Sequence, residues 1–417
     1  MVSRRTILKT AAVGVGAATL NYYGRYAVAQ TNDPIRIGVM TPLSGPAETS
    51  GLAVKAGAEI AVAQINKAGG IKGRPLALEF RDDKANVAQA TAAARELLGM
   101  GINLLTGSNS SGVVAALGPV MQQENGVLIS TLASAASINH ENYNPNVFRA
   151  GETPYARMRG LAQIAAQKHK DLRSWSGIIP DTDFGRSSWA VFSSALKEFI
   201  PAAGGAAPEI LDPVVVPLFS PDYKNFITAL MRVPFEGLFQ ATYGADSITL
   251  FNQARPYGLV QKAKAIFDSG NEFVVAKAMK NQTPAWWGSI FWYHDNHKDN
   301  PIAQALYNDF DAISDNMPPE GYVAEAHADI YAYAKAVEKA GSTETPAVVA
   351  ALKGLEWQTA TGRRFMRPED NQAIKDIEAV YVEPADNAAG WRVADAAKVA
   401  GDSMIEPPTP GQKLEMK

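Results

Sequence analysis

The sequence contains no cysteine among its 417 residues. This absence excludes thiol catalysis, iron–sulfur clusters and zinc sites built from cysteine. Histidine is scarce as well, with five residues in all, and only His294 and His297 lie close together. No third and fourth ligand stands at a recognisable spacing from this pair. We therefore interpret the pair as part of a surface loop and expect neither a metal ion nor another cofactor.

The motifs of common enzyme classes are also missing. The sequence contains no Gly-x-Ser-x-Gly, His-Glu-x-x-His or protein-kinase signature. Two adjacent carboxylates occur at Asp82-Asp83, but neighbouring residues of a strand point to opposite faces, so a strand-end turn with a capping Asp is the better interpretation. We expect a binding protein and not an enzyme.

A strong excess of charge of either sign is absent. Charged residues make up 19% of the sequence, hydrophobic residues make up 47%, and the formal net charge is −3. This composition predicts a folded protein with a sizeable core, and the length suggests two domains. The slight acidic excess argues against nucleic acid or an anionic membrane surface as a partner.

Residues 1–29 match an export signal. The run Ser3-Arg4-Arg5-Thr6-Ile7-Leu8-Lys9 is a twin-arginine motif, and a mildly apolar stretch follows it at 11–20. This stretch is too short to span a membrane. Ala27-Val28-Ala29 is a typical cleavage site, so the mature chain is expected to begin at Gln30. We expect export to the periplasm by the twin-arginine pathway.

Strands and helices alternate through most of the remaining chain. Strand patterns occur at 35–40, 75–80, 102–106, 126–131, 174–179, 214–216, 237–241 and 264–267. Helical patterns separate them, at 52–67, 87–98, 113–120, 153–168, 186–199, 221–231 and 247–255. Such alternation predicts an α/β protein with doubly wound parallel sheets, in which ligands bind at the carboxyl ends of the strands.

The last third of the chain is less regular. An aromatic run at 286–293 is predicted to be a strand whose rings lie in the core, and the alternative is a platform for a ligand. Further helices are expected at 301–313, 321–339 and 345–352, and further strands at 363–366 and 377–382. Three prolines at 406–417 predict a mobile tail.

A polar loop follows the predicted strand at 102–106. Gly107 permits a turn, and Ser108-Asn109-Ser110-Ser111 then precedes an apolar helical pattern. Short polar side chains at a helix start can cap the helix, or they can hold a carboxylate together with exposed backbone N–H groups. The residues of the loop leave both interpretations open.

Five short motifs stand between residues 37 and 83. They are Ile37-Gly38-Val39, Leu43-Ser44-Gly45-Pro46, Ala63-Gln64-Ile65-Asn66, Gly69-Gly70-Ile71-Lys72-Gly73 and Asp82-Asp83. Together they resemble the leucine/isoleucine/valine-binding proteins of ABC importers, which are type I periplasmic solute-binding proteins. The resemblance implies two α/β lobes joined by three crossovers, with a ligand cleft between the lobes.

The resemblance also implies lobe boundaries. The crossovers would lie near Gly151, Ser289 and Met366. The N-terminal lobe would comprise residues 30–150 and 290–366, the C-terminal lobe residues 151–289 and 367–400, and the tail residues 401–417.

A set of ligand-binding residues follows from the same resemblance. In the first lobe, the hydroxyl of Ser111 and nearby backbone amides would hold a ligand carboxylate. In the second lobe, Phe184 and Tyr243 would cover the ligand. The full candidate set is Ser50, Asn109, Ser110, Ser111, Ala133, Ser134, Ala135, Phe184, Tyr243, Asp268 and Ser269.

The identity of the ligand is left open. Ser269 stands at or beside the position where these relatives carry a glutamate that pairs with a ligand ammonium, and a serine cannot neutralise a buried charge. This difference favours a carboxylate without an α-amine, and the alternative is an amino acid whose ammonium pairs with Asp268. We expect a monomer that captures such a solute by lobe closure and delivers it to an ABC permease. A ligand sensor of the same fold is the alternative function.

Overall fold

The computed structural model describes residues 33–45, 47–217, 220–314, 319 and 321–415. The predicted export signal lies outside these residues. Within them, the chain forms two lobes, each built around its own sheet, and the predicted α/β fold class is confirmed.

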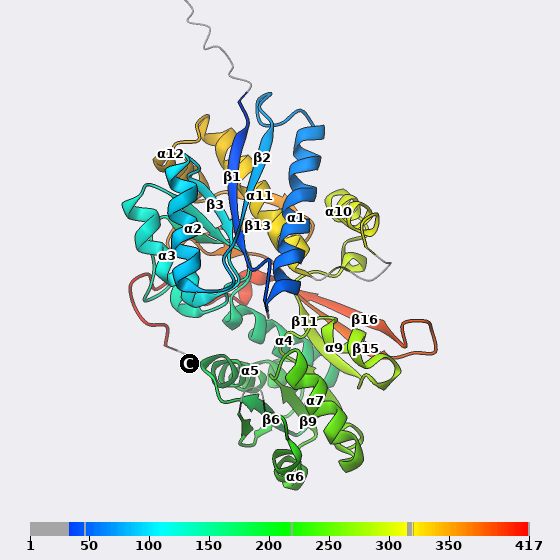
Figure 1. Ribbon diagram of the computed structural model, residues 1–417. Helices are drawn as coiled ribbons and strands as arrows, with labels where there is room; N and C mark the ends of the chain where they lie inside the picture. Colours follow the sequence, from blue (N-terminus) through cyan, green and yellow to red (C-terminus); the bar gives the residue numbers. More distant parts are fainter. Residues whose placement is uncertain (1–32, 46, 218–219, 315–318, 320, 416–417) are drawn as a thin grey trace, which may run out of the picture. The chain divides into compact units, whose positions relative to one another are not determined.

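The first lobe is built on a five-stranded sheet in the order β2-β1-β3-β4-β5, and all of its strands are parallel. The strands are β1 (Ile35–Thr41), β2 (Leu76–Asp82), β3 (Leu104–Gly107), β4 (Val127–Ser130) and β5 (Val147–Arg149). Helices α1 (Glu48–Lys67) and α11 (Gly321–Ala340) cover one face, and α2 (Val87–Gly99) and α3 (Ser111–Gln123) cover the other (Figure 1).

The core of this lobe follows from the alternation of side chains along each strand. Ile37 and Val39 of β1 pack with α1 and α11, whereas Met40 packs with α2 and α3. Both faces of the sheet are therefore buried, as expected for parallel strands. The lobe is completed by α10 (Pro301–Asp311), α12 (Thr345–Leu352), β12 (Glu356–Thr359), β13 (Gly362–Met366) and β14 (Ala373–Ile374).

The second lobe is built on an eight-stranded sheet in the order β16-β15-β11-β10-β9-β6-β7, with β8 paired to β6. The strands are β6 (Ser174–Pro180), β7 (Glu209–Ile210), β8 (Val214–Val216), β9 (Gly237–Gln240), β10 (Ala265–Asp268), β11 (Trp286–Ile290), β15 (Ile377–Pro384) and β16 (Trp391–Val399). One face packs against α4 (Pro154–His169) and α5 (Asp183–Ala202). The other face packs against α6 (Lys224–Arg232), α7 (Ala245–Ala254) and α9 (Val274–Met279).

Short helical turns complete the described chain. They are η1 (Ala136–Ile138), η2 (Arg255–Tyr257), α8 (Leu259–Lys262), η3 (Lys280–Gln282), η4 (His294–His297) and η5 (Gly401–Ser403).

One edge of the second sheet differs from the parallel pattern that we predicted. Strands β15 and β16 run antiparallel, β15 beside β11 and β16 beside β15. The sequence did not predict β16, because its alanines and charged residues have low strand propensity. Its place at the edge of the sheet tolerates such a sequence, since most of its side chains remain at least partly exposed.

The third crossover lies later than the resemblance implied. Residues 367–374 stay with the first lobe, because β14 pairs with β13 and the Asn371 side chain donates to the carbonyls of Pro145 and Val147. The boundary expected near Met366 is therefore wrong. The polar residues that follow Met366 are typical of a linker. In the structure, however, most of their side chains are buried and form hydrogen bonds. Ile290 likewise belongs to β11 of the second lobe.

The expectation of a mobile tail is wrong for residues 406–415. Glu406 is 1% exposed and its Oε2 accepts a hydrogen bond from Thr153 Oγ1 at 2.6 Å. The backbone N–H of Gly411 donates to the carbonyl of His140 at 2.7 Å. These partners lie far away in the sequence, so the prolines alone gave no sign that the segment packs against the lobes.

A buried carboxylate lies beneath the first sheet. Asp329 of α11 accepts hydrogen bonds from the Oγ1 atoms of Thr106 and Thr131, at 2.9 and 2.5 Å, and is fully buried. Its other oxygen, Oδ1, has no hydrogen-bond partner among the described residues. Burial raises the pKa of Asp329 to about 8. The carboxyl group is therefore mostly protonated in the folded protein at neutral pH.

This pKa predicts how Asp329→Asn changes stability. Because the folded pKa lies above the unfolded value, wild-type stability is lost as the pH rises from about 4 to about 8. Asp329→Asn has no carboxyl group to titrate and lacks this loss. Its free energy of unfolding should therefore rise relative to that of wild type by up to about 1 kcal/mol per pH unit in this window. Urea denaturation at pH 5, 6, 7 and 8 measures the difference. The exposed Asp171→Asn is the control, and equal pH profiles for the two variants would contradict the prediction.

Candidate functional site

Two adjoining cavities lie between the lobes. The first, which we call the inner pocket, encloses about 20 Å³, and its lining includes Ser134, Arg149, Glu152, Arg157, Phe184 and Phe291. The second, which we call the outer groove, holds about 550 Å³, and its lining includes Ser111, Ser134, Ala135, Phe184, Lys413 and Leu414. Since Ser134 and Phe184 line both cavities, the inner pocket and the outer groove adjoin.

Four of the first-lobe candidates line these cavities. Ala133 and Ser134 line the inner pocket, and Ser111, Ser134 and Ala135 line the outer groove. The Ser111 hydroxyl accepts a hydrogen bond from the backbone N–H of Ala135 at 3.0 Å. Its own proton is still available to donate, so this hydroxyl has the chemistry that a ligand carboxylate requires.

The other three first-lobe candidates are not among the lining residues of either cavity within the described part of the chain. Asn109 Nδ2 donates to Ser50 Oγ at 2.7 Å. Ser110 is the N-cap residue of α3, but its side chain makes no capping hydrogen bond. The capping interpretation of this loop is therefore not realised at Ser110.

The two aromatic candidates of the second lobe contact each other. Phe184 lines both the inner pocket and the outer groove. The ring of Tyr243 lies edge-on to it, with the ring centroids 6.3 Å apart. Tyr243 is 40% exposed and is not among the described lining residues, so it supports Phe184 from outside the cavities.

The remaining candidates, Asp268 and Ser269, are buried at the end of β10. The Asp268 carboxylate accepts hydrogen bonds from the Gln240 side chain, the Gly270 N–H, and the backbone and side-chain nitrogens of Asn271. Burial raises the pKa of Asp268. In the structure this carboxylate is held by hydrogen bonds inside the second lobe, and a ligand contact at Asp268 stays a prediction.

Seven lining residues of the inner pocket were missed by the sequence analysis, and four of them carry a charge or an aromatic ring. These four are Arg149, Glu152, Arg157 and Phe291. The sequence did carry one signal for the charged residues of this pocket. Three charged residues occur within nine positions, next to the predicted crossover at Gly151. Phe291 belongs to the aromatic run, whose Trp286, Trp287 and Trp292 are core residues as predicted.

Arg149 is buried at the end of β5 and is 1% exposed. Its Nε donates to Gln372 Oε1 at 2.5 Å and its Nη1 to the carbonyl of Ala135 at 2.8 Å. Its Nη2 is buried without a hydrogen-bond partner among the described residues. Burial lowers the pKa of Arg149 to about 10, so the guanidinium remains charged at neutral pH.

Glu152 and Arg157 form an ion pair in the inner pocket. Arg157 Nε lies 3.3 Å from Glu152 Oε1, and Lys375 Nζ lies 3.7 Å from Glu152 Oε2. Neither carboxylate oxygen of Glu152 has a hydrogen-bond partner among the described residues. Burial raises the pKa of Glu152, and the two neighbouring cations act in the opposite direction.

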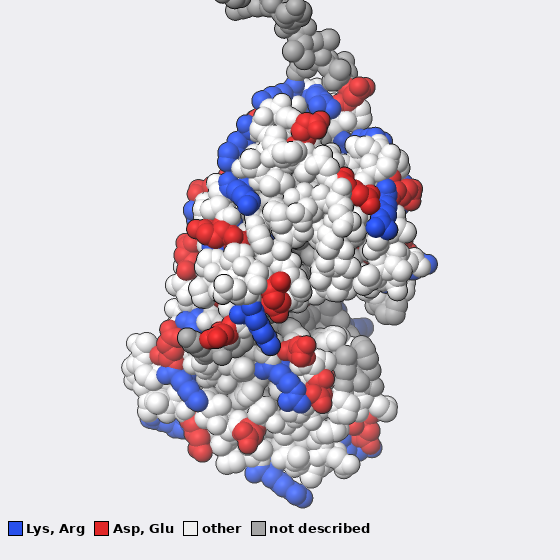
Figure 2. Space-filling model, turned by 90° about the vertical axis from the view of Figure 1, so that its left-hand side faces the viewer, with Lys and Arg blue, Asp and Glu red and all other residues white. Residues whose placement is uncertain are grey.

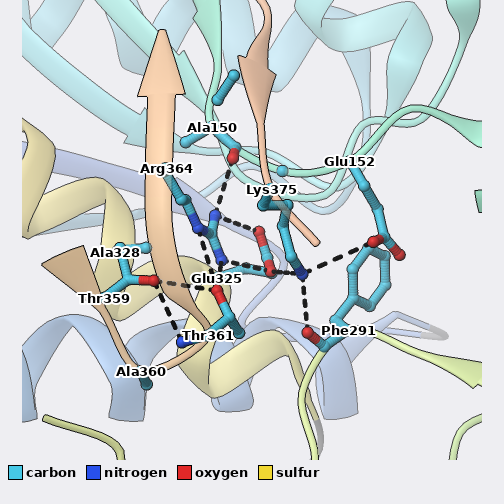
Figure 3. A network of polar contacts seen from close by, with 12 residues as sticks. Ala150, Glu152, Phe291, Glu325, Ala328, Thr359, Ala360, Thr361, Arg364 and Lys375 are labelled. Carbon is cyan, nitrogen blue, oxygen red and sulfur yellow. Dashed lines mark hydrogen bonds and ion pairs between the residues drawn. The ribbon is translucent and has the colours of Figure 1, made fainter. Parts of the chain in front are cut away.

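A network of buried charges holds the three crossovers together (Figure 3). Glu325 of α11 accepts hydrogen bonds from Arg364 Nη1 and Nη2, both at 2.8 Å, and from Lys375 Nζ at 3.0 Å. Arg364 Nη1 also donates to the carbonyl of Ala150, and Lys375 Nζ donates to that of Phe291, each at 2.8 Å. Burial acts to raise the pKa of Glu325, but the two cations outweigh it and lower the pKa.

The two histidines of the close pair lie in different surroundings. His297 is 6% exposed and its Nε2 lies 2.7 Å from Glu378 Oε1, so the surface-loop interpretation is wrong for this residue. His294 stacks on Tyr307, with ring centroids 3.9 Å apart. Within the described residues, no group of three or more His, Cys, Asp or Glu side chains is arranged to hold a metal ion.

Charged residues of both signs are mixed on the visible surface. Figure 2 shows Lys and Arg mixed with Asp and Glu over the visible face, without a large area of one sign. This face offers no basic patch of the kind that nucleic acids require.

Among the described helices, none combines the length and apolar character needed to cross a bilayer.

The fold and the cavities define the class of protein. Two α/β lobes that share three crossovers and enclose cavities between them have the architecture of a two-lobed ligand-binding protein. A family model described as periplasmic binding protein matches residues 34–389. The chain belongs to this family, and the resemblance stated from the sequence motifs is confirmed.

Curated relatives agree with this assignment. The chain is 28% identical over 339 residues to the Leu/Ile/Val-binding protein homolog 3 of Brucella melitensis. The matched region covers 79% of this chain and 86% of that relative. It is 25% identical to the leucine-, isoleucine-, valine-, threonine- and alanine-binding protein of Pseudomonas aeruginosa, over 79% of this chain and 85% of that relative.

A solved structure of an ABC-type branched-chain amino acid transporter protein from Rhodopseudomonas palustris has the same fold. The two structures superpose with a TM-score of 0.77 and are 22% identical in sequence. The superposition covers 90% of this chain and 99% of that chain. A solute-binding protein from Rhodopseudomonas palustris in complex with 3,4-dihydroxybenzoic acid has a TM-score of 0.71 at 19% identity, over 88% and 98% of the chains.

The charged network makes a prediction about stability. Glu325→Gln leaves Arg364 and Lys375 buried without a compensating charge, so the variant should lose about 3–5 kcal/mol of unfolding free energy. Glu356→Gln is the matched control, because Glu356 pairs with Arg363 on the exposed surface and contributes little. Urea denaturation at pH 7 measures both variants. Similar unfolding midpoints for the two would contradict a structural role of the network.

Proposed function

We propose that the chain is the extracytoplasmic solute-binding protein of an ABC importer and that it binds a small carboxylate or an amino acid between its lobes. The observation that carries the proposal is the pair of adjoining cavities, since the inner pocket brings arginines from both lobes together with two phenylalanine rings and the outer groove supplies the volume that a solute needs. A mostly apolar wall with a few convergent polar groups is typical of small-molecule sites. In this proposal the protein has no catalytic activity of its own.

The names of relatives support this class of ligand. Two of them are named for binding branched-chain amino acids. Two structural neighbours are described in complex with 3,4-dihydroxybenzoic acid and with 4-hydroxybenzoate. All of these ligands carry a carboxylate, which the Ser111 hydroxyl and the guanidinium groups of Arg149 and Arg157 would receive.

Ligand capture would proceed by closure of the lobes about the three crossovers. A solute that contacts both lobes stabilises the closed form by the difference between its affinities for the two forms. The closed, loaded protein, acting as a monomer, would then present its surface to a permease in the membrane.

Phe184 provides a test of the binding site. Phe184→Ala removes the ring that lines both cavities, so affinity for the bound solute should fall about tenfold or more. Tyr257→Ala is the control, because Tyr257 is also a partly exposed aromatic residue but lies outside both cavities. Solutes are first identified by thermal shift with amino acids and carboxylates, and affinity is then measured by calorimetry. Equal affinities of the two variants would refute this location of the site.

The export route is tested separately. Changing Arg4 and Arg5 together to Lys should leave the unprocessed precursor in the cytoplasm, because the twin-arginine pathway requires this pair. Arg25→Lys is the control, since it makes the same substitution outside the motif and should leave export intact. Cell fractionation followed by mass spectrometry of the mature N-terminus measures both. Periplasmic mature protein from the double variant would exclude this route.

A further inference from the structure

The inner pocket holds more positive than negative charge. Among its described lining residues, Arg149 and Arg157 are cations and Glu152 is an anion. Glu152 is shared between Arg157, at 3.3 Å, and Lys375, at 3.7 Å. Lys375 is also held by Glu325 at 3.0 Å and does not line the pocket. Two lining cations therefore face one lining carboxylate, an excess of positive charge that repels an entering ammonium group and attracts a carboxylate.

Arg157 is fixed by its neighbours but retains free donors. Its Nε donates to Ser289 Oγ at 2.7 Å, and its Cζ lies 4.1 Å from the centroid of the Phe291 ring. Its Nη2 donates to the Ser289 carbonyl at 3.4 Å, and its Nη1 makes no hydrogen bond within the described residues. A guanidinium that is stacked on a ring and held at one end is pre-organised to bind a planar carboxylate with its remaining N–H groups.

Gly270 leaves room for this guanidinium. A Cβ atom at Gly270 would lie 2.7 Å from Arg157 Nη2 and 2.9 Å from Cζ. Any other residue at this position would displace the guanidinium. The glycine that follows β10 therefore makes room for the Arg157 guanidinium, which comes from α4.

We infer that Arg157 is a specificity-determining residue, which receives the ligand carboxylate from the second-lobe side and makes the site select acids that lack an α-ammonium group. The inference rests on the proposed function and narrows its ligand class. Arg149 Nη2, buried without a partner among the described residues, approaches the same carboxylate from the first lobe. The ligand anion then joins the two lobes when they close.

The first test compares ligands that differ in one group. Leucine and 4-methylpentanoate share the carboxylate and the branched chain and differ only in the ammonium group. Benzoate and benzamide differ in the charge of the acid group. By titration calorimetry at pH 7, the better of the two carboxylates should bind wild type at least tenfold more tightly than leucine and than benzamide.

The second test changes Arg157. Arg157→Gln should weaken binding of the carboxylate about 10- to 100-fold, because a charge-assisted hydrogen bond is lost. Arg157→Lys should lie between this variant and wild type. The weak affinity for benzamide should change less than about threefold. Arg159→Gln is the matched control, since Arg159 lies on the same helix and pairs with Glu198 at 2.9 Å, outside the inner pocket.

Each contrary outcome has a definite meaning. Equal losses of benzoate and benzamide affinity in Arg157→Gln would show a general structural role and overturn the inference. Leucine binding that is tighter than that of 4-methylpentanoate and is lost in Glu152→Gln would assign Glu152 to a ligand ammonium, which overturns the inference and keeps the proposed function. Failure of wild type to bind any of the twenty amino acids or a panel of aliphatic and aromatic carboxylates would overturn both.

Discussion

One buried carboxylate, that of Glu325, connects the segments through which the chain passes between its lobes. Arg364 and Lys375 both donate to it, and each also binds a backbone carbonyl of another crossover. No side chain of this trio is exposed to solvent. Each charge therefore depends on the others for compensation, and the relative arrangement of the three crossovers depends on all of them.

The same network reaches the candidate site. Lys375 lies next to Glu152, which in turn pairs with Arg157 in the inner pocket. The charges of the inner pocket and the charges at the crossovers are thus parts of one continuous group. This continuity explains how these five charged side chains can be buried at the crossovers, since each of them has at least one partner of opposite sign within the group.

The sequence predicted the fold well where local signals agree with the final packing. The helix predicted at 153–168 is α4, whose start has the typical local signals of a Thr153 cap and Pro154 in the first turn. The alternation of strands and helices likewise predicted the parallel sheet of the first lobe. The tail and the third crossover were mispredicted, because Glu406 and Asn371 are fixed by partners distant in sequence. The candidate site was only partly predicted, since Arg149, Glu152 and Arg157 are of types that usually lie on the surface.

The packing of the C-terminal segment has a practical consequence. Lys413 and Leu414 line the outer groove, next to Ser111 and Phe184. Under the proposed function, a fluorescent dye attached at position 413 would lie in the groove that the solute enters, so its emission would report occupancy. Position 413 is therefore a suitable attachment point for an optical sensor.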